Sequence, residues 1–480
     1  MNIHSARRSQ RERSSERKPR ELTQRSTFTR LLRGELFVGG LCVASRIAAA
    51  AASLASCIVV ARTLSADQAG VVFLFQTILL LSSTAIRCGI DHVIIREVAV
   101  AGSQDAAQKV LLDAVGIVAV LGTLGWVAAA GWECWLAAWI PFDPFVGFSV
   151  QAMSFTLVSS MVGVALCHCF ACYFQGRHRH LFGSFLSVHV MPTSLLFAAA
   201  AVATQGGGDA WGVLHLQAAW LGILAAGCLA IGFVRATVPV RLNVDDCWRL
   251  VRTSSSMFRL TIISYLNNWL PQLILSAFAP PASIAVFSVS QRTGGLIPLV
   301  IQPVAAVASP RFAELGRGRH ASDLRATLLR FNCVILAIGL PLLSILAVFG
   351  ERLMSVFGPL ADDSVTLFHI ILVGQCTTVL VGTGGHLLMM TGRERRLQNA
   401  TLVATVIGAI LGMLWIPLHG AIGAAVCVTT NLVIYNGIVG WLLYDQWRSH
   451  DSKPNDSMHL TAPDAKKPSA PRHLPRNQAA

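Results

Sequence analysis

Long runs of apolar residues, separated by short polar stretches, recur along most of the chain. A helix needs roughly 20 apolar residues to cross the hydrocarbon core of a bilayer. The pattern therefore predicts an all-α membrane protein with about twelve transmembrane helices. Their expected bounds are 36–61, 70–88, 110–130, 148–172, 181–203, 214–234, 257–278, 284–308, 328–348, 365–390, 399–417 and 421–444.

The polar stretches divide the predicted helices into two halves of six helices each. The longest polar connection between spans is the segment 235–256, which we expect to be a cytoplasmic connector. It separates an N-terminal six-helix half, 35–234, from a C-terminal six-helix half, 257–446. The two ends of the chain, 1–34 and 447–480, are polar and rich in basic residues. We expect both ends to be disordered cytoplasmic tails.

The composition excludes an ordinary soluble protein. Hydrophobic residues make up 54% of the chain, charged residues only 13%, and the mean hydropathy is +0.59. A soluble domain carries about 25% charged residues, so the surplus apolar surface requires lipid. The 12 cysteines lie mostly inside apolar runs and there replace small apolar residues, so no disulfide framework is expected.

The basic residues predict how the helices are oriented. With the N-terminus placed in the cytoplasm, 34 of the 38 Lys and Arg residues fall in cytoplasmic segments and two, Arg62 and Arg352, fall outside. This asymmetry follows the positive-inside rule and predicts that both termini are cytoplasmic. It also accounts for the net charge of +14 without a nucleic-acid partner.

The two remaining basic residues, Arg46 and Arg292, lie near the middle of the first and eighth predicted spans. An arginine at this depth costs at least about 2.5–3.5 kcal/mol when it faces lipid. Each should therefore face a water-filled cavity or a partner. Because the two arginines belong to different halves, a cleft between the halves could present both to one anion. A guanidinium group suits the oxygens of a phosphate.

Polar residues near these arginines are further candidates for lining a cavity. Gln291 lies beside the arginine of the eighth span, and Ser264 and Asn268 share one face of the seventh. Pro271 and Pro298 could bend the seventh and eighth spans and open the cavity. The alternative interpretation is that these polar side chains only join neighbouring helices.

The sequence offers no candidate for catalysis. Cys167, His168, Cys169 and Cys172 resemble a metal cluster, but side chains from one helix cannot converge tetrahedrally, so no metal is expected. Asp91 and Asp113 lie near the inner ends of helices, where they could join an ion or proton relay, but a structural pairing with nearby arginines is the favoured interpretation. No catalytic triad or P-loop is present, which argues against an enzyme, a cofactor and direct use of ATP. An ion gradient or the membrane potential is the expected energy source.

Four stretches carry a resemblance to a known family. They are Ala-Arg-Thr-Leu-Ser at 61–65 with Gly70, Gly-Ile-Asp at 89–91 with Arg96-Glu97, Leu-Met-Met-Thr-Gly-Arg at 388–393, and Ile-Pro-Leu-His-Gly-Ala-Ile-Gly-Ala-Ala at 416–425. Together they resemble the polysaccharide-transport flippases, which export O-antigen and exopolysaccharide units and belong to the multidrug/oligosaccharidyl-lipid/polysaccharide exporter superfamily. The resemblance covers about 36–444.

This resemblance implies a function in the bacterial inner membrane. The chain is expected to flip an oligosaccharide linked to polyprenyl pyrophosphate, for lipopolysaccharide O-antigen or exopolysaccharide, by alternating access. Its expected partners are this lipid-linked substrate, membrane lipids, and polysaccharide polymerases and glycosyltransferases. Related lipid II flippases are thought to use cavity arginines on spans one, two and eight. Arg46 and Arg292 match the first and last, but the second span has only Arg87, at its inner end.

Three alternatives to this function are a multidrug or cation antiporter, a membrane glycosyltransferase or polymerase, and a membrane scaffold that transports nothing. A multidrug or cation antiporter of the same superfamily would need a buried carboxylate, but no Asp or Glu lies at the middle of a span. A membrane glycosyltransferase or polymerase would need a large outer loop for its chemistry, and the predicted outer loops are short. Two mid-span arginines favour an anionic cargo instead.

Overall fold

The computed structural model describes six stretches of the chain, and every regular element in them is a helix. The described residues are 40–42, 44–135, 150–206, 208–234, 244–317 and 321–451. The predicted tail 1–34 and nearly all of the tail 447–480 lie outside them, as does the beginning of the connector. Eight helices are long and apolar enough to cross a membrane, or ten if each of two bent pairs counts as one span.

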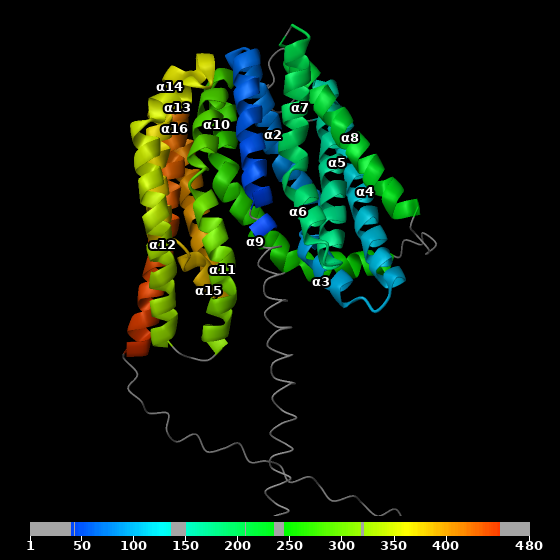
Figure 1. Ribbon diagram of the computed structural model, residues 1–480. Coiled ribbons are helices and arrows are strands. Elements are labelled where there is room, and N and C mark those ends of the chain that lie inside the picture. The colour runs from blue at the N-terminus through cyan, green and yellow to red at the C-terminus, as the bar shows by residue number, and fades with distance from the viewer. Residues whose placement is uncertain are drawn as a thin grey trace, which may run out of the picture.

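The helices form two bundles that stand side by side (Figure 1). The first bundle contains the span Gly40–Thr63, α2 (Ala66–Ile86), α3 (Ile90–Val100), α4 (Gln104–Trp135), α5 (Val150–Gly176), α6 (His180–Val188), α7 (Val190–Thr204) and α8 (Ala210–Val234). The second contains α9 (Val244–Phe278), α10 (Pro281–Gly294), α11 (Pro298–Arg317), α12 (Ala321–Val348), α13 (Gly350–Ser355), η1 (Gly358–Leu360), α14 (Ala361–Val381), α15 (Gly384–Met390) and α16 (Glu394–Asp451).

Two predicted spans are broken rather than straight. The eighth span bends by 40° between α10 and α11, and Pro298 begins the second piece, so the bend predicted there is confirmed. The fifth span bends by 50° between α6 and α7, which the sequence analysis did not predict. Pro192 lies in the first turn of α7 and has no N–H to donate to Val188, so the helix cannot continue unbroken.

The longest helix, α16, reverses direction at Gly420. The glycine has φ +55° and ψ −130°, a conformation that residues with a Cβ rarely adopt. The thiol of Cys427 donates a hydrogen bond to the carbonyl of Gly408 at 3.0 Å, which joins positions on either side of the reversal. The predicted hairpin between two spans is therefore confirmed, and α16 consists of two antiparallel arms.

Helix α9 links the two bundles. It begins inside the predicted connector, at Val244, and continues without a break into the second bundle. Its first turns are tied to the first bundle, because Lys109 donates to Asp246 at 2.6 Å and Ser254 donates to the Cys88 carbonyl at 2.8 Å. The hydrogen bond and the charge of Lys109 lower the pKa of the Asp246 carboxyl. The described part of the connector is thus docked rather than free.

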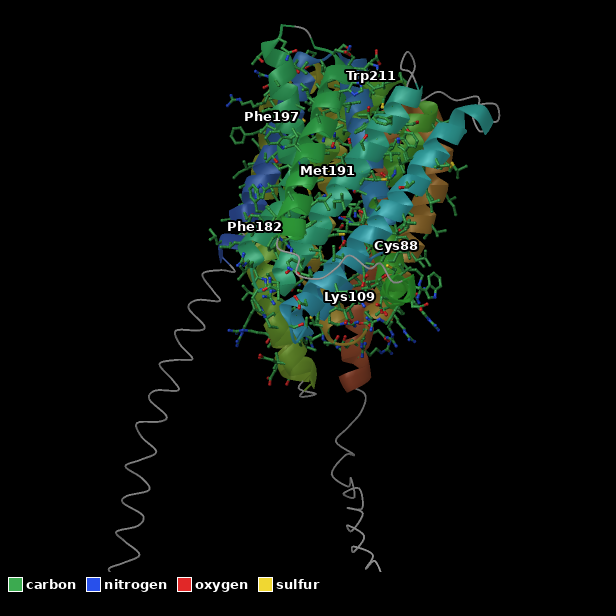
Figure 2. All side chains as sticks on the ribbon, turned by 90° about the vertical axis from the view of Figure 1, so that its right-hand side faces the viewer. Cys88, Lys109, Phe182, Met191, Phe197 and Trp211 are labelled. Carbon is green, nitrogen blue, oxygen red and sulfur yellow. The ribbon has the colours of Figure 1, made fainter. Side chains whose placement is uncertain are left out.

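Apolar side chains occupy both the interior and the outer faces of the bundles. Phe73, Phe287 and Phe368 are fully buried, whereas Leu124 and Val373 are about 60% exposed on helix surfaces. Such an outer face fits a hydrocarbon environment. Side-chain nitrogens gather at the end of the molecule that carries Lys109 (Figure 2), which we call the basic end, and the opposite end we call the far end.

Candidate functional site

Arg292 occupies a position that the helix break creates. It lies in the last turn of α10, just before the chain bends into α11. The last carbonyls of a helix carry partial negative charge, so a cation is favoured there. The break therefore places this positive side chain at the C-terminal end of a helix in the middle of the eighth span.

The side chain of Arg292 crosses from the second bundle to the first. Its Nη1 lies 3.5 Å from the Sγ atom of Cys57 on the first span, and its guanidinium lies 5.3 Å from the ring centre of Phe73 on α2. The ring face is a weak partner for a cation. The Nε atom is buried and has no hydrogen-bond partner among the described residues. The guanidinium thus keeps capacity to bind an additional acceptor.

Arg292 lines a pocket of about 170 Å³ between the two bundles. The other lining residues are Ser53 and Ser56 of the first span, Gln76, Thr77 and Leu80 of α2, Met191, Pro192 and Leu195 of α7, and Trp269 of α9. No carboxylate is among these described lining residues. A pocket with hydroxyl and amide groups, an aromatic ring and one unpaired cation suits an anion that also carries sugar hydroxyls.

Hydrogen bonds fix the polar wall of this pocket. Gln76 is 3% exposed and its Nε2 donates to the Oε1 of Gln217 on α8 at 2.6 Å. Gln217 in turn donates to the hydroxyl of Ser194 on α7 at 3.3 Å. Buried amides held in this way keep one orientation. Neither Gln76 nor Trp269 was among the residues predicted from the sequence, although a lone Gln in an apolar run is a signal that could have identified the first.

Arg46 also contacts the opposite bundle, but at a different level. It is exposed, and its Nη1 donates to the Oε1 of Gln302 on α11 at 3.2 Å. Arg46 is 11 positions before Cys57, the contact of Arg292. At 1.5 Å per residue this is about 16 Å along the first span. The two arginines therefore stand at separate heights along the interface rather than at one point.

The other three predicted site residues, Gln291, Asn268 and Ser264, are connected by two hydrogen bonds. Gln291 donates to the Asn268 carbonyl at 2.8 Å, and Asn268 donates to the Ser264 carbonyl at 2.8 Å. The first bond joins the last turn of α10 to α9, and the second lies within α9. Gln291, Asn268 and Ser264 do not line the pocket of Arg292. Their role as substrate ligands stays a prediction.

The two bundles also meet at the far end. Arg62 donates through Nε to the Val356 carbonyl at 2.7 Å, and Asp67 accepts from the backbone N–H of Ala282 at 3.0 Å. Gly70 approaches Pro281 so closely that a Cβ atom on the glycine would lie 1.8 Å from the proline carbonyl oxygen. These contacts close the interface between the bundles beyond the pocket.

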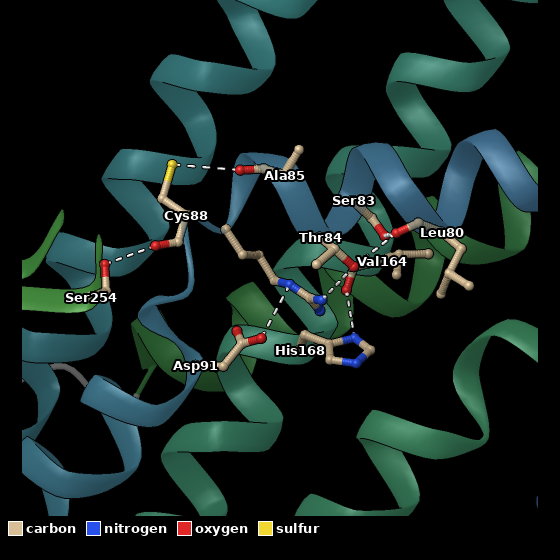
Figure 3. Close-up of polar contacts among 10 residues, drawn as sticks. Leu80, Ser83, Thr84, Ala85, Cys88, Asp91, Val164, His168 and Ser254 are labelled. Atoms are coloured by element: carbon tan, nitrogen blue, oxygen red, sulfur yellow. Dashed lines mark hydrogen bonds and ion pairs between the residues drawn. The ribbon is translucent and has the colours of Figure 1, made fainter. Parts of the chain in front are cut away.

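A second buried arginine lies within the first bundle (Figure 3). Arg87 is only 4% exposed. Its Nη2 donates to the Thr84 hydroxyl at 3.1 Å and its Nε lies 3.5 Å from Asp91, so the predicted pairing with an arginine is confirmed for Asp91. Asp113 forms no ion pair with an arginine among the described residues, so the same prediction was wrong for Asp113. Nη1 has no partner among the described residues, and His168 of α5 lies beside the group. The sequence placed Arg87 correctly at the end of its span but did not predict its burial.

Comparisons with known proteins give both a family and a fold. Residues 39–316, more than half of the chain, match the family model described as "Polysaccharide biosynthesis protein". No curated protein sequence is significantly similar. Among solved structures, an inward-facing multidrug resistance MATE family transporter of the MOP superfamily is 14% identical, with a TM-score of 0.61, over 86% of this chain and 100% of that one.

Two further structures support the same fold. The lipid II flippase MurJ in an inward closed conformation is 11% identical, with a TM-score of 0.65, over 84% of this chain and 87% of that one. An outward-facing MATE transporter of the MOP superfamily is 12% identical, with a TM-score of 0.51, over 87% and 96% of the two chains. The chain therefore has the fold of these membrane transporters, which are not enzymes.

Proposed function

We propose, from the premise that the chain belongs to the polysaccharide biosynthesis protein family, that it flips a polyprenyl-pyrophosphate-linked oligosaccharide across the bacterial inner membrane. The oligosaccharide is an O-antigen or exopolysaccharide unit. The observation that carries this proposal is the guanidinium of Arg292, which lines a pocket between the bundles with its Nε unpaired among the described residues. An unpaired cation at this depth suits a diphosphate.

Alternating access is the proposed mechanism. The contacts of Arg62, Asp67 and Gly70 with the second bundle hold the far end closed. The higher TM-score with the inward-facing MATE transporter than with the outward-facing one, 0.61 against 0.51, supports an inward-facing state. In the proposed cycle, Arg46 meets the diphosphate nearer the basic end and Arg292 holds it deeper, before the far end opens.

The proposed topology has twelve spans with both termini in the cytoplasm. Ten of these spans are the helices and bent pairs that are long and apolar enough to cross a membrane. The other two are α9 and the second arm of α16, which is counted separately from the first. The basic end then faces the cytoplasm, in agreement with the positive-inside rule. The cycle is driven by an ion gradient or the membrane potential, and the chain works beside glycosyltransferases and a polymerase.

A multidrug or cation antiporter is the alternative, because two of the similar structures are multidrug transporters. Such a carrier needs an acidic group to hold its cationic cargo. The described lining of the pocket contains an arginine and no carboxylate, so its charge favours an anion.

The test is complementation of a strain that lacks the gene. We expect the deletion to remove surface glycan and to leave sugar-lipid on the inner leaflet. Arg292→Ala should export at least about tenfold less, since hydrogen bonds to charged groups contribute about 1.5–3 kcal/mol. Arg292→Lys should retain part of the activity because it keeps the charge but not the planar fork. Arg46→Ala should also reduce export.

The matched control is Arg395→Ala, an exposed arginine outside the pocket. All variants are compared at equal abundance in the membrane. Normal glycan export by both Arg292→Ala and Arg46→Ala would reject the proposed role of the arginines. Normal export by the deletion strain would reject the function itself.

A further inference from the structure

A second, larger pocket lies away from the interface between the bundles. Its volume is about 500 Å³. It is formed by α4, α5 and α8, which lie together on the flank of the molecule away from the second bundle (Figure 1). Its lining residues are Gln104, Gln108, Leu111, Phe170, Tyr173, Phe174, Arg177, Arg179, Ile231 and Gly232. The pocket of Arg292 shares none of them, so the proposed export cycle does not account for it.

Two arginines line this pocket without a partner. Arg177 and Arg179 are exposed, and within the described ranges neither side chain forms an ion pair or hydrogen bond. Asp105, next to Gln104 on α4, is not part of the lining. Two adjacent cations at one rim attract an anion. The pocket thus presents unbalanced positive charge at the basic end.

The backbone holds these arginines in place at the end of α5. The N–H of Arg179 donates to the Phe174 carbonyl at 2.9 Å, and the N–H of His178 donates to Gln175 at 3.0 Å. This pair of bonds is the Schellman motif, in which the residue after the helix is left-handed. His178 has φ +59°, although glycine is usual there. The turn therefore fixes the backbone from which both arginine side chains reach the lining of the pocket.

The pocket continues as an apolar crevice toward the middle of the membrane. A narrow extension of about 20 Å³ shares Gln108, Leu111, Phe170 and Gly232 with it and is further lined by Leu112, Val115 and Leu229. Helices α4 and α8 both pack extensively on α5 but not on each other, so α5 forms the floor of the crevice. A Cβ on Gly232 would lie 2.9 Å from the Phe170 ring, so the absence of a side chain there keeps the crevice open.

We infer that this pocket binds an anionic phospholipid of the leaflet at the basic end. The phosphate of its headgroup contacts Arg177 and Arg179, and an acyl chain lies along the crevice between α4 and α8. Basic pockets between transmembrane helices on the cytoplasmic side suit anionic headgroups. A soluble anion would use the arginines but would have no need of the apolar crevice, which is why a lipid is the occupant that fits both parts.

The test uses the purified full chain in vesicles that contain photoreactive phosphatidylglycerol or, separately, photoreactive phosphatidylcholine. In the unmodified protein, we expect photoreactive phosphatidylglycerol to label α4 and α8 around Leu112, Val115 and Leu229. Arg177→Gln with Arg179→Gln should reduce this labelling about thirty-fold, since each basic residue near an anionic headgroup contributes about fivefold. No sugar-lipid is present, so the result does not depend on the proposed export activity.

Matched control variants distinguish the loss of the two arginines, or the filling of the crevice, from a general loss of protein structure. Arg311→Gln with Arg395→Gln removes two exposed arginines from the other bundle and should leave labelling unchanged. Gly232→Leu should fill the crevice and reduce labelling, whereas Gly227→Leu, on the same helix where a Cβ meets nothing within 4 Å, should not.

Three results would overturn the inference. They are unchanged labelling in the Arg177→Gln, Arg179→Gln variant, equal labelling of these residues by phosphatidylcholine, and displacement of the lipid by millimolar inorganic phosphate. The last would indicate a site for a free anion instead of a lipid.

Discussion

Individual arginines in this protein differ in what surrounds them, and this difference decides what each can do. Arg292 has a sulfur atom and a ring face beside it and an unpaired Nε in the described structure, so it can bind an anion. Arg87 is more deeply buried and is held by Thr84 and Asp91. A paired cation of this kind serves the structure of the first bundle rather than a substrate.

The pairing of Arg87 predicts a loss of stability when it is removed. Arg87→Met leaves the partly buried Asp91 carboxylate without its counter-charge and should reduce the free energy of unfolding by about 2–3 kcal/mol. The measurement is the midpoint of thermal unfolding in detergent. Adding Asp91→Asn should recover part of the loss, because the unpaired charge is then gone.

Arg96→Met provides the control, since Arg96 is 61% exposed and pairs with Glu97 at 3.1 Å. Exposed pairs contribute about 0–1 kcal/mol. If Arg87→Met unfolds at the same temperature as Arg96→Met, the pair with Asp91 has no structural role.

The sequence indicated the positions of these residues but not their surroundings. Arg292 was recognisable because a cation in an apolar run is rare and costly. The burial of Arg87 could not be predicted, because it depends on how α5 packs against the end of α2. The place of Trp269 in the pocket lining could not be predicted either. The sequence does not show whether a tryptophan in a membrane helix faces a pocket, a neighbouring helix or lipid.

At the scale of helices, the close approach of α10 to Gly70 of α2 determines whether the far end is closed. Helices α2 and α10 pack extensively against each other and meet where Gly70 touches Pro281. In the sequence, Gly70 is recognisable only as part of a family motif. Its physical role could not be predicted, because a segment 211 residues later in the chain provides the contact.

Gly70→Val should therefore force α2 and α10 apart and open the far end. The native thiol of Cys57, buried in the pocket region, provides the readout. We expect a membrane-impermeant maleimide added outside cells to label Cys57 several times faster in the variant, as located by mass spectrometry. Gly222→Val, at a helix position where a Cβ meets nothing within 4 Å, should label like the wild type. Equal labelling of all three proteins would contradict this role for Gly70.

The first turns of α9 offer a second prediction at this scale. Asp246→Asn removes the negative charge that pairs with Lys109 and should speed amide hydrogen exchange over the start of α9 at pH 7. Lys109 lowers the pKa of Asp246, so the wild-type contact should persist at neutral pH and be lost only as pH falls through that lowered pKa. Asp323→Asn, which removes an equivalent acid from the first turn of α12, should not alter exchange in α9.

At the scale of the whole molecule, contacts between the two bundles lie on both sides of the pocket of Arg292. The contact of Arg46 with Gln302 lies toward the basic end, and the contacts of Arg62 and Asp67 lie at the far end. The division into two six-helix halves rests on the polar connector and the repeated apolar runs, and it stays a prediction. The closure of the far end could not be predicted, because neither hydropathy nor charge indicates which of two conformations a chain adopts.

Locking the far end should stop export if the bundles must separate there. In Arg62→Cys with Val356→Cys, a thiol-cleavable bismaleimide can join the two cysteines across the space that the arginine side chain spans to reach the Val356 carbonyl. Cross-linking should abolish export and cleavage by a reductant should restore it, with the cross-link verified by mass spectrometry. Thr63→Cys with Gly208→Cys links two close positions within the first bundle and should leave export unchanged after the same treatment. Continued export by the cross-linked Arg62→Cys, Val356→Cys protein would exclude opening at this end.

In the hydrogen bonds of Arg62 and Asp67 at the far end, the two bundles contribute different kinds of groups. The first bundle contributes the side chains of Arg62 and Asp67, whereas the second contributes only the main-chain carbonyl of Val356 and the main-chain N–H of Ala282. No replacement at position 356 can delete that carbonyl, and at position 282 only proline would remove the N–H. Substitutions can therefore change the strength of these two contacts almost only at positions 62 and 67 of the first bundle. Correlated substitutions between the two bundles should for this reason be absent at these contacts across homologues.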